Sequence, residues 1–476
     1  MTTFKSEFSE YQKSRLSFWD HVISRQLNSL GGYYHKCLRD TYINLVSTDK
    51  SVLEIGCGCG DLLAQLNPCM GVGIDFSSKA ITIARSHHPR LQFYVSDAHH
   101  FEIQQQHFDY IIVSELVNDL WDAQLFLEHI LRYCHPGTRI IFNFYSHLWN
   151  APLSLARHLK LARPVLAQNW LTRHDMQNLL EISGYQELRS WKECILPIYI
   201  PGLSKWVNRY LAKIWPFSHL AITNLMIARP ACVSNAINPS VSVIIAARNE
   251  SGHIQELIER TPQMGSHTEI IFVEGNSTDD TQDVIKRVIE EFPDRDIKLF
   301  TQTGKGKGNA VRLGFEKAKG DILMILDADI TVPPEDLPRF YSLMASGTAE
   351  FVNGVRLVYP MQKDSMRFLN LLGNKFFSWT FSWLLGQQIR DTLCGTKVLW
   401  SRDYDRIAKA RSYFGDFDPF GDFDLLFGAS RLNLKILEVP IRYRARRYGE
   451  TNISRWRHGW LLIRMVFFAA RRIKFI

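Results

Sequence analysis

The sequence predicts an α/β protein with two doubly wound domains that are joined by a short linker. Two observations carry this prediction. Short apolar runs alternate with helical patterns twice along the chain, once from about residue 50 to 145 and again from residue 241, and this rhythm is typical of a parallel sheet covered by helices. The chain also has 476 residues, which is more than one hydrophobic core normally holds.

Five short apolar runs in the first series are predicted to be parallel strands. They are Ser51–Ile55, Gly71–Ile74, Leu91–Val95, Tyr110–Ser114 and Arg139–Phe144. Residues 1–45, where aromatic and basic side chains are interleaved, are predicted to form helices. Residues 150–230 are apolar and are also predicted to be helical, although prolines interrupt them. We assign residues 1–230 to the first domain.

The segment 231–240 is polar, small and without periodicity, so we interpret it as the linker between the domains. A second series of predicted strands follows it. These strands are Val241–Ala246, Glu269–Val273, Lys298–Thr301, Asp321–Leu326 and Glu350–Val355. We assign residues 241–450 to the second domain and residues 451–476 to an aromatic and basic C-terminal segment.

The composition is that of a soluble globular protein, with 46% hydrophobic and 22% charged residues. The formal net charge of +8 suits phosphate-rich ligands, nucleic acid or an anionic membrane face, without choosing between them. The eight cysteines are scattered along the chain, as in reduced intracellular proteins. No signal peptide and no apolar run of about 18 residues is visible. We therefore expect a cytoplasmic protein without a transmembrane helix.

A glycine-rich turn follows the first predicted strand and precedes a helical pattern. It reads Glu54-Ile55-Gly56-Cys57-Gly58-Cys59-Gly60, and its glycines allow the backbone to turn sharply and to approach a ligand closely. The next strand ends at Asp75, where a carboxylate can accept both hydroxyls of a ribose. The third strand is followed by Ser96-Asp97-Ala98, which is placed to hydrogen-bond an adenine amino group.

These three motifs resemble the class I S-adenosylmethionine-dependent methyltransferases over residues 45–145. The resemblance implies a Rossmann-like methyltransferase fold with S-adenosyl-L-methionine as cofactor. The cofactor-binding residues that it implies are Glu54, Gly56, Gly58, Gly60, Asp75, Asp97 and Ala98, with the glycines at the methionine part, Asp75 at the ribose and Asp97 at the adenine. A nicotinamide-binding Rossmann domain is the rival, but it usually opens Gly-x-Gly-x-x-Gly rather than Gly-x-Gly-x-Gly.

The methyl acceptor of this domain is less well defined by the sequence. The Asn/Asp-Pro-Pro-aromatic motif of many nucleic-acid amino-methyltransferases is absent from residues 114–119, which favours an oxygen acceptor. Conceivable general bases or acceptor contacts are Glu115, Asn118, His147 and His174.

The second domain places polar residues after each of its predicted strands. Asp327-Ala328-Asp329 ends the apolar run Ile322–Leu326, and two carboxylates there can hold a hard divalent cation against a diphosphate. The other strand ends carry Ala247-Arg248-Asn249-Glu250, Glu274 to Thr281 and the lysine–glycine run Gly304–Asn309. Because the carboxyl ends of parallel strands share one edge, these motifs are expected to converge.

This set resembles the family 2 glycosyltransferases of the GT-A fold over residues 240–450, and among them the dolichyl- or polyprenyl-phosphate sugar synthases. The resemblance implies a nucleotide-sugar donor, and Mg²⁺ or Mn²⁺ at Asp329 and Asp327. The implied donor-binding residues are Ala247, Arg248, Glu250, Glu274, Asp279, Lys307 and Asp327. One departure is that the family commonly has Asp-Asp where this chain has Glu274-Gly275, so nucleotide specificity is left open.

The resemblance also implies an acceptor side. Asp391 to Lys397 fits the family's acceptor segment, and Asp422 falls on the expected general base, with Asp424 as its close alternative. Arg447 lies in the basic segment that closes on the diphosphate, where it would stabilise leaving-group charge.

The C-terminal segment from Arg455 mixes aromatic and basic residues, which suits a helix in a lipid headgroup layer, a core helix or an RNA-binding arm. We expect a lipid-phosphate or glycan acceptor, a location on the inner face of the cell membrane and no nucleic-acid partner. The function predicted is a bifunctional enzyme that transfers a sugar, with inversion, and methylates a small molecule or glycan. The alternatives are a glycosyltransferase whose first domain only binds or interacts, and a processive polysaccharide synthase.

Overall fold

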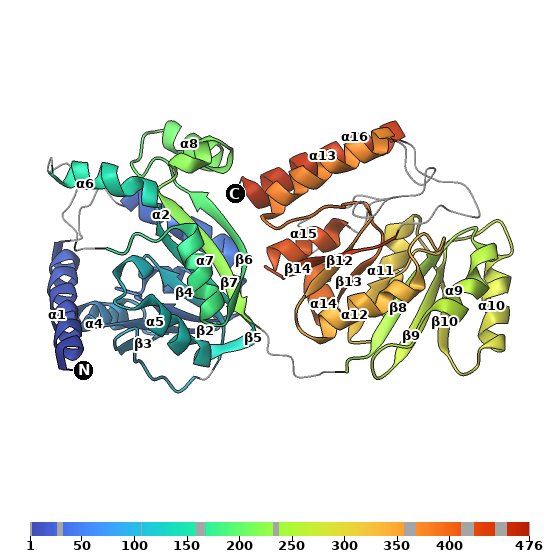
Figure 1. The fold of residues 1–476 in the computed structure, drawn as a ribbon, viewed down its shortest axis with the longest axis horizontal. Coiled ribbons are helices and arrows are strands. Elements are labelled where there is room, and N and C mark those ends of the chain that lie inside the picture. The colour runs from blue at the N-terminus through green and yellow to red at the C-terminus, as the bar shows by residue number, and fades with distance from the viewer. Residues whose placement is uncertain are drawn as a thin grey trace. The chain divides into compact units, whose positions relative to one another are not determined.

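The computed structural model shows two α/β units, as the sequence predicts (Figure 1). The structure describes residues 2–25, 32–105, 107–158, 166, 168–231, 238–356, 368–410, 423–442 and 455–475. Contacts between Cα atoms divide the chain into one unit of Met1–Ala231 with Phe475–Ile476, and a second unit of Cys232–Lys474.

The first unit contains a seven-stranded sheet in the order β3-β2-β1-β4-β5-β7-β6. Its strands are β1 (Ser51–Ile55), β2 (Met70–Asp75), β3 (Gln92–Val95), β4 (Phe108–Ser114), β5 (Cys134–Tyr145), β6 (Tyr185–Glu193) and β7 (Thr223–Pro230). Strands β1 to β5 pair in parallel, whereas β7 runs antiparallel to both β5 and β6. The five strands predicted in this region are therefore confirmed.

The prediction that residues 150–230 are helical is wrong for two segments, because β6 and β7 complete the sheet there. Strand β7 is buried at every position, although Thr223, Asn224 and Arg229 flank its apolar residues, so its sequence does not alternate as that of a half-exposed strand does. Strand β6 at the sheet edge is mostly polar and half-buried, so it carries little periodicity.

Helices pack on both faces of the first sheet and build two hydrophobic clusters. The helices are α1 (Thr2–Arg25), α2 (Gly32–Leu45), α3 (Asp61–Gln65), α4 (Ser78–His87), α5 (Ala123–Ile130), α6 (Asn150–His158), α7 (Arg173–Ile182) and α8 (Leu203–Arg209). Figure 1 shows α1 standing beside α4, at the side of the sheet that ends in β3. Residues 1–45 were predicted to form helices, and α1 and α2 confirm this.

The second unit contains a seven-stranded sheet in the order β10-β9-β8-β11-β13-β12-β14. Its strands are β8 (Val241–Ala247), β9 (Thr268–Glu274), β10 (Asp296–Thr301), β11 (Ile322–Ile325), β12 (Phe351–Val355), β13 (Lys397–Trp400) and β14 (Ile436–Pro440). Strands β8 to β11 pair in parallel, and β13 runs antiparallel to β11 and β12. The five predicted strands are confirmed, whereas β13 and β14 were not foreseen.

The helices of the second unit are α9 (Ile254–Arg260), α10 (Thr281–Glu291), α11 (Lys307–Lys317), α12 (Leu337–Ala345), α13 (Phe368–Leu385), α14 (Ser401–Lys409), α15 (Phe423–Arg431) and α16 (Arg455–Ala469). Figure 1 shows α13 and α16 lying side by side in this unit. No helix of the described residues is both long and apolar enough to span a bilayer.

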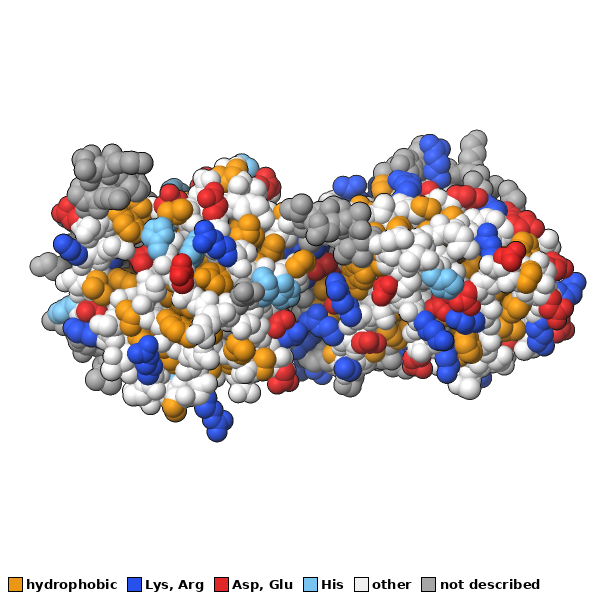
Figure 2. Space-filling view, turned by 90° about the horizontal axis from the view of Figure 1, so that it is seen from below, with side chains coloured by type: hydrophobic (Ala, Val, Ile, Leu, Met, Phe, Trp, Pro, Cys, Tyr) orange, Lys and Arg blue, Asp and Glu red, His pale blue; other side chains and the backbone are white. Residues whose placement is uncertain are grey.

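The surface around α9 and α10 is an ordinary solvated face. Figure 2 shows acidic and basic side chains intermixed over the right-hand end of the molecule, where Figure 1 places these two helices. Helix α10 buries Thr281 at its first position together with Ile285 and Val288 of its apolar stripe. This face serves below as a comparison for a surface of different composition.

Candidate active sites

The glycine-rich turn after β1 takes a backbone path that favours glycine. Gly56, Gly58 and Gly60 have φ angles of 78°, 52° and 78°, a region that other residues adopt at a cost. A Cβ atom on Gly60 would lie 2.6 Å from the Phe93 ring, whereas one on Gly58 would meet nothing within 4 Å. Gly60 is therefore needed for packing, and the space beside Gly58 is open to a ligand.

Two acidic residues, Asp75 and Glu54, accept hydrogen bonds from backbone amides of this turn and of the helix that follows it. Asp75, at the end of β2, accepts hydrogen bonds from the Gly58 amide through Oδ2 and from the Ser77 amide through Oδ1, both at 2.9 Å. Glu54 is buried and accepts the Leu63 amide at 3.0 Å. Burial raises the pKa of Glu54 to about 8 and also raises the pKa of Asp75. Each carboxylate retains acceptor capacity toward a ligand at this edge.

Asp97 lies after β3 at the same edge and contacts helix α1. Its Oδ2 accepts from the Gln12 amide nitrogen at 2.9 Å, and its Oδ1 accepts from the His99 amide at 2.8 Å. Burial works to raise the pKa of Asp97, but the hydrogen bonds from His99 and Gln12 lower it to about 2. Ala98 is half-buried and packs against the hydrophobic cluster of this face. Gln12 was not predicted to belong to the site, because nothing in a local helical pattern shows which edge the helix covers.

Glu115 follows β4 and lies beside two groups from distant parts of the chain. Tyr145 Oη donates to Glu115 Oε1 at 2.8 Å, and His35 Nδ1 lies 3.4 Å from Oε2. Burial opposes the ionised form of Glu115, but these partners hold its pKa below the ordinary value, and the hydrogen bond with Glu115 raises the pKa of His35. Glu115 also has a φ of 57°, a strained angle for a residue with a side chain.

The other acceptor-side candidates of the first unit lie elsewhere. Asn118 is buried and bridges the Tyr145 amide at 3.1 Å and the Asn169 carbonyl at 2.7 Å, which is a structural role. His147 Nδ1 lies 3.3 Å from the Trp170 carbonyl, and His174 is exposed on α7. Glu115 is thus the predicted candidate that the structure brings into a cluster of titratable groups.

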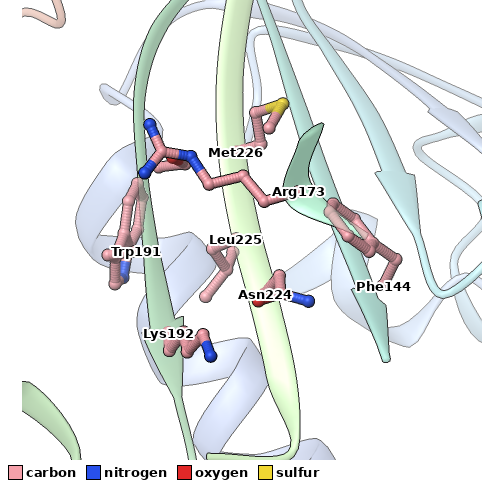
Figure 3. Close-up of a pocket in the computed structure, with 8 residues that line it drawn as sticks. Phe144, Arg173, Trp191, Lys192, Asn224, Leu225 and Met226 are labelled. Carbon is pink, nitrogen blue, oxygen red and sulfur yellow. The ribbon is translucent and has the colours of Figure 1, made fainter. Parts of the chain in front are cut away.

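A separate small cavity of about 80 Å³ lies over the β5-β7-β6 part of the first sheet (Figure 3). Phe144, Trp191 and Met226 line it, and Arg173 at the start of α7 reaches across it. Arg173 also pairs with Glu187 at 3.0 Å. The predicted cofactor residues do not line this cavity, so it is distinct from the carboxyl edge of β1, β2 and β3.

In the second unit, hydrogen bonds connect the loop after β8 to the loop after β9. Glu250 is buried, its Oε2 lies 3.0 Å from His253 Nδ1, and its amide donates to Thr281 Oγ1 at 3.0 Å. Asp279 accepts from the Thr281 amide at 3.1 Å and from the Ser251 amide at 3.5 Å. Asp279 therefore fixes the shape of both loops, which is a positioning role beside the predicted donor site.

Glu274 ends β9 in a buried position and accepts the Ser277 amide at 2.5 Å. A Cβ atom on Gly275 would lie 3.1 Å from Arg248 Cβ, so the small residue allows Arg248 to pass closely. Ala247 is buried at the end of β8, whereas Arg248 is exposed beyond it. The predicted nucleoside contacts thus surround one loop pair at the carboxyl edge of β8 and β9.

Asp327 follows β11 and forms an ion pair with Lys307, the first residue of α11. Gly395 lies directly against this pair, since a Cβ atom there would be 2.2 Å from Asp327 Oδ2. Burial works to raise the pKa of Asp327, but the positive charges of Lys307, Lys397 and Arg356 outweigh it and lower the pKa. The structure therefore brings Lys307 and Asp327 together, as the predicted site requires.

Asp329 accepts from Thr331 through its amide at 3.2 Å and its hydroxyl at 2.7 Å. The residue between them, Ile330, has a φ of 52°. A β-branched residue at such an angle is a genuine outlier, and strain of this kind is typical of functional sites. The backbone after the two carboxylates is thus held in a conformation that local sequence does not favour.

The predicted acceptor segment contributes a buried ionic network. Asp391 accepts from Arg356 at 2.7 Å (Nε) and 2.9 Å (Nη2) and from Asn374 at 3.1 Å. Lys397 is buried and donates to the Cys394 carbonyl at 2.6 Å. Asp391 is therefore a residue that orients Arg356, whose charge acts on Asp327. Sequence reasoning missed Arg356, although its place just after the predicted strand 350–355 was a usable signal.

The three predicted catalytic residues are only partly described. Asp424, on α15, is buried and lies 3.4 Å from Arg312 Nη2 on α11. Asp422 and Arg447 lie outside the described residues, so their roles stay predictions.

Comparisons with known proteins agree with the two resemblances. Residues 47–187 match the family model described as Methyltransferase domain, and residues 242–406 match the model of Glycosyl transferase family 2. The chain thus carries a methyltransferase domain followed by a family 2 glycosyltransferase domain.

Curated relatives match parts of the chain. A low-salt glycan biosynthesis hexosyltransferase, Agl6 of Haloferax volcanii, is 30% identical over 48% of this chain and 54% of its own length. An undecaprenyl-phosphate 4-deoxy-4-formamido-L-arabinose transferase of Pseudomonas syringae is 33% identical over 22% of this chain and 33% of its own length. The chain therefore spans about half or less of the length of these relatives.

Similar solved structures exist for both units. One is a putative methyltransferase in complex with the Trm112 activator of Haloferax volcanii, with 18% identity, coverage of 42% of this chain and 92% of that chain, and a TM-score of 0.34. Another is the glucosyl-3-phosphoglycerate synthase of Mycobacterium tuberculosis, with 19% identity, coverage of 49% and 80%, and a TM-score of 0.36.

Proposed function

We propose that this protein is a bifunctional transferase that moves a sugar from a nucleotide-diphosphate donor to a polyprenyl phosphate or glycan, and a methyl group from S-adenosylmethionine to a small molecule or glycan. The observation that carries the proposal is the convergence of Asp327, Asp329 and Lys307 beside Glu274 and Glu250 at one sheet edge. That edge is where open α/β sheets bind ligands.

The donor set at this edge fits a divalent cation and a diphosphate. Asp327 and Asp329 supply carboxylate oxygens, the ligands that Mg²⁺ and Mn²⁺ prefer. When bound, such a cation would neutralise charge on the diphosphate leaving group. Lys307, Arg356 and Lys397 place positive charge around Asp327. The half-buried Lys307 and Arg356 would bind diphosphate oxygens and stabilise the nucleoside diphosphate as it departs, whereas Lys397 is buried and would contribute only its charge.

The transfer itself is proposed as an in-line displacement with inversion. An acceptor oxygen forms the new bond to the anomeric carbon while the bond to the diphosphate oxygen breaks. For a hydroxyl acceptor, Asp422 is the proposed base that removes the proton, with Asp424 as the alternative. A lipid phosphate is already ionised near neutral pH and would need positioning more than deprotonation. The pairing of Asp424 with Arg312 favours a positioning role for Asp424.

A lipid-linked acceptor is supported by the relatives and by one surface. Several relatives are named as undecaprenyl-phosphate transferases. On α13 and α16, the large apolar side chains of Phe376, Trp379, Trp460 and Phe467 are exposed. Exposed Arg464 lies on the same helix pair. Aromatic and basic side chains on amphipathic helices suit a headgroup layer, so we propose that this helix pair rests on a membrane, at its inner face.

In the first unit, S-adenosylmethionine would bind along the edge formed by Gly58, Asp75 and Asp97. The open space at Gly58 and the acceptor capacity of the two carboxylates fit this cofactor. It would supply an electrophilic methyl group. An acceptor hydroxyl would transfer its proton to the Glu115–His35 pair. In this pair Glu115 raises the pKa of His35 and His35 lowers the pKa of Glu115, so each group stabilises the charged form of the other.

Sugar transfer is tested by incubating the purified protein with Mn²⁺, undecaprenyl phosphate in a bacterial lipid extract, and labelled UDP-, GDP- and dTDP-sugars. We expect label in the organic phase from one donor, with a loss of about 100-fold or more in Asp329→Asn. If every donor stays intact while the protein binds metal and nucleotide, the proposed transfer to lipid is wrong.

Methyl transfer is tested first by calorimetry with S-adenosylmethionine. Binding by the wild-type protein and its loss in Asp75→Asn would support the cofactor site. Binding without methyl transfer to any glycan or lipid acceptor would favour the alternative in which this domain is a non-catalytic module.

A further inference from the structure

The first unit carries an apolar surface that neither proposed activity uses. Residues 198–220, between β6 and β7, expose ten large apolar side chains. The most exposed are Trp215 at 76%, Tyr199 at 61%, Leu220 at 57%, Ile198 at 55% and Trp206 at 52%. We call residues 198–220 the apolar segment. Exposed apolar groups in such density mark an interaction surface, whereas scattered ones are ordinary.

The apolar segment is an ordered structure whose buried polar side chains are hydrogen-bonded to the backbone of this unit. Asn208 is buried and its Oδ1 accepts the amides of Ile195 and Leu196, both at 2.9 Å. Ser204 is buried, accepts the Ile200 amide at 2.9 Å and donates to the Ile198 carbonyl at 2.6 Å. The outward direction of the apolar side chains is therefore fixed by an ordered interior.

Charge distinguishes this surface from an ordinary one. The sequence contains no Asp or Glu between Glu193 and Glu250, whereas Lys205 is exposed within the apolar segment. By contrast, the α9 and α10 face mixes both signs of charge (Figure 2). An apolar surface with Trp and Tyr, basic charge and no acid matches the chemistry of a bilayer interface with anionic headgroups.

The register of the sheet places the apolar segment beside the predicted methyl-transfer site. Tyr145 pairs with Thr223, and Thr223 pairs with Glu193, so the segment begins and ends at the carboxyl end of β5. Trp149 donates to the Leu220 carbonyl at 2.9 Å, and the Tyr33 ring lies 5.4 Å from the Tyr199 ring. Tyr145 and its neighbours on α2 also surround Glu115.

We propose that the apolar segment docks the methyltransferase unit on an anionic lipid bilayer, so that the methyl acceptor reaches Glu115 from the membrane surface. The acceptor part of this statement rests on the proposed methyl transfer, whereas bilayer docking does not. Helices α13 and α16 belong to the other unit, whereas Phe475 near the end of the chain belongs to this one and contacts Arg209 and Tyr210 of the apolar segment.

The test is flotation of the full-length protein with vesicles of phosphatidylcholine and phosphatidylglycerol, and with vesicles of phosphatidylcholine alone. One variant carries Trp206→Ser, Trp215→Ser and Leu220→Ser. A second carries Trp379→Ser, Trp460→Ser and Phe467→Ser in the other unit. The matched control carries Val95→Ser and Ile182→Ser, which remove exposed apolar side chains of the first unit outside the apolar segment. Circular dichroism and S-adenosylmethionine binding check that each variant is folded.

We expect the wild type and the control to bind anionic vesicles. The fraction of the apolar-segment variant that is bound should be at least fivefold lower than that of the wild type. Equal binding by the apolar-segment variant and the wild type, or no binding by the wild type, overturns the proposal. A wild-type dimer that dissociates in the apolar-segment variant, without vesicle binding, overturns it in favour of a second copy of the chain. Because no transfer reaction is measured, failure of either proposed activity leaves this test interpretable.

A second readout uses a conservative variant. Trp206→Phe and Trp215→Phe together keep aromatic bulk, so vesicle binding should persist. Brominated lipids should then quench less tryptophan fluorescence than in the wild type, because the quenched rings have been removed. Equal quenching in both proteins would show that these two rings do not enter the bilayer.

Discussion

At the scale of single residues, the carboxylates at the strand ends differ in what surrounds them. Asp97 is held by hydrogen bonds that lower its pKa to about 2, so it stays ionised at any physiological pH. Glu54 lies in the core, where burial raises its pKa to about 8. Asp327 is surrounded by positive charge that keeps its pKa low. Acidic residues in similar sequence positions thus have different charges at neutral pH, because the pKa depends on burial and on neighbouring groups.

Glu54→Gln should change how stability depends on pH. The folded-state pKa of Glu54 is raised from 4.5 to about 8, so its contribution to stability is fully present below 4.5 and is lost as pH rises to about 8. The variant cannot ionise and escapes this loss. Thermal unfolding should therefore show similar melting temperatures at pH 4 and a more stable variant at pH 9.

The exposed Glu128 provides the control for this prediction. Glu128→Gln should leave the difference between pH 4 and pH 9 as in the wild type. Equal pH dependence of the wild type and Glu54→Gln would show that Glu54 is not buried as the structure has it.

Gly395→Ala should damage sugar transfer with little effect on folding. The new Cβ atom would lie 2.2 Å from Asp327 Oδ2, so the carboxylate and Lys307 must move. A displacement of about 1 Å at a reacting site costs about 100-fold in rate. Initial rates with the donor identified by the transfer assay would measure this loss.

Gly373→Ala is the matched substitution, since a Cβ atom at Gly373 meets nothing within 4 Å. It should keep wild-type transfer and fold normally on α13. Full activity in Gly395→Ala would contradict a catalytic role for the Asp327–Lys307 pair.

Sequence patterns located the strand-end acids but not most of their partners. Asp75, Asp97 and Asp327 follow apolar runs, a signal that lies within a few residues. Gln12 and His35 come from helices far along the chain and reach the site only through tertiary packing. A single sequence shows that a helix forms more readily than it shows which edge of a sheet that helix covers.

At the scale of elements, the ten predicted strands were found because short buried runs stand out between helical patterns. Strands β6, β7, β13 and β14 were missed for a shared reason. Each lies in the half of its sheet where antiparallel pairing interrupts the strand–helix alternation. Strand β12 lies in the same half of the second sheet and was still predicted from its own short run. The alternation that predicts a parallel sheet thus gives no signal for most of the strands beyond the parallel part.

Helix α1 is held on the first unit by an ion pair between Arg15 and Asp119, both largely buried. Tyr11 also donates to the Asp119 carbonyl. Arg15→Ala would leave Asp119 buried with its main cation removed, and we expect a loss of about 1–3 kcal/mol in the free energy of unfolding. Urea unfolding of the full chain measures it.

Arg39→Ala provides the comparison on the neighbouring helix, because the Arg39–Asp40 pair is much more exposed. It should cost less than about 1 kcal/mol. Equal losses in both variants would show that α1 is not anchored through Asp119.

At the scale of the whole molecule, each unit has its own sheet and its own hydrophobic core. Ligands should therefore stabilise the units separately. Calorimetric unfolding with S-adenosylmethionine at a hundredfold excess over Kd should stabilise one transition by about 2.7 kcal/mol. The other transition should shift only when the nucleotide and Mn²⁺ are added. A single transition that responds equally to both ligands would contradict two independent sites.

The central claim is that one chain catalyses two transfers at two sites. It is tested most directly in one reaction that contains vesicles with undecaprenyl phosphate, tritiated S-adenosylmethionine and the carbon-14-labelled nucleotide sugars. The account predicts that the wild type transfers both labels to product. Asp329→Asn should lose the transfer of carbon-14-labelled sugar, and Asp75→Asn should lose the transfer of the tritiated methyl group while it retains sugar transfer. Label from neither source above that of the Asp75→Asn, Asp329→Asn double variant would contradict the account.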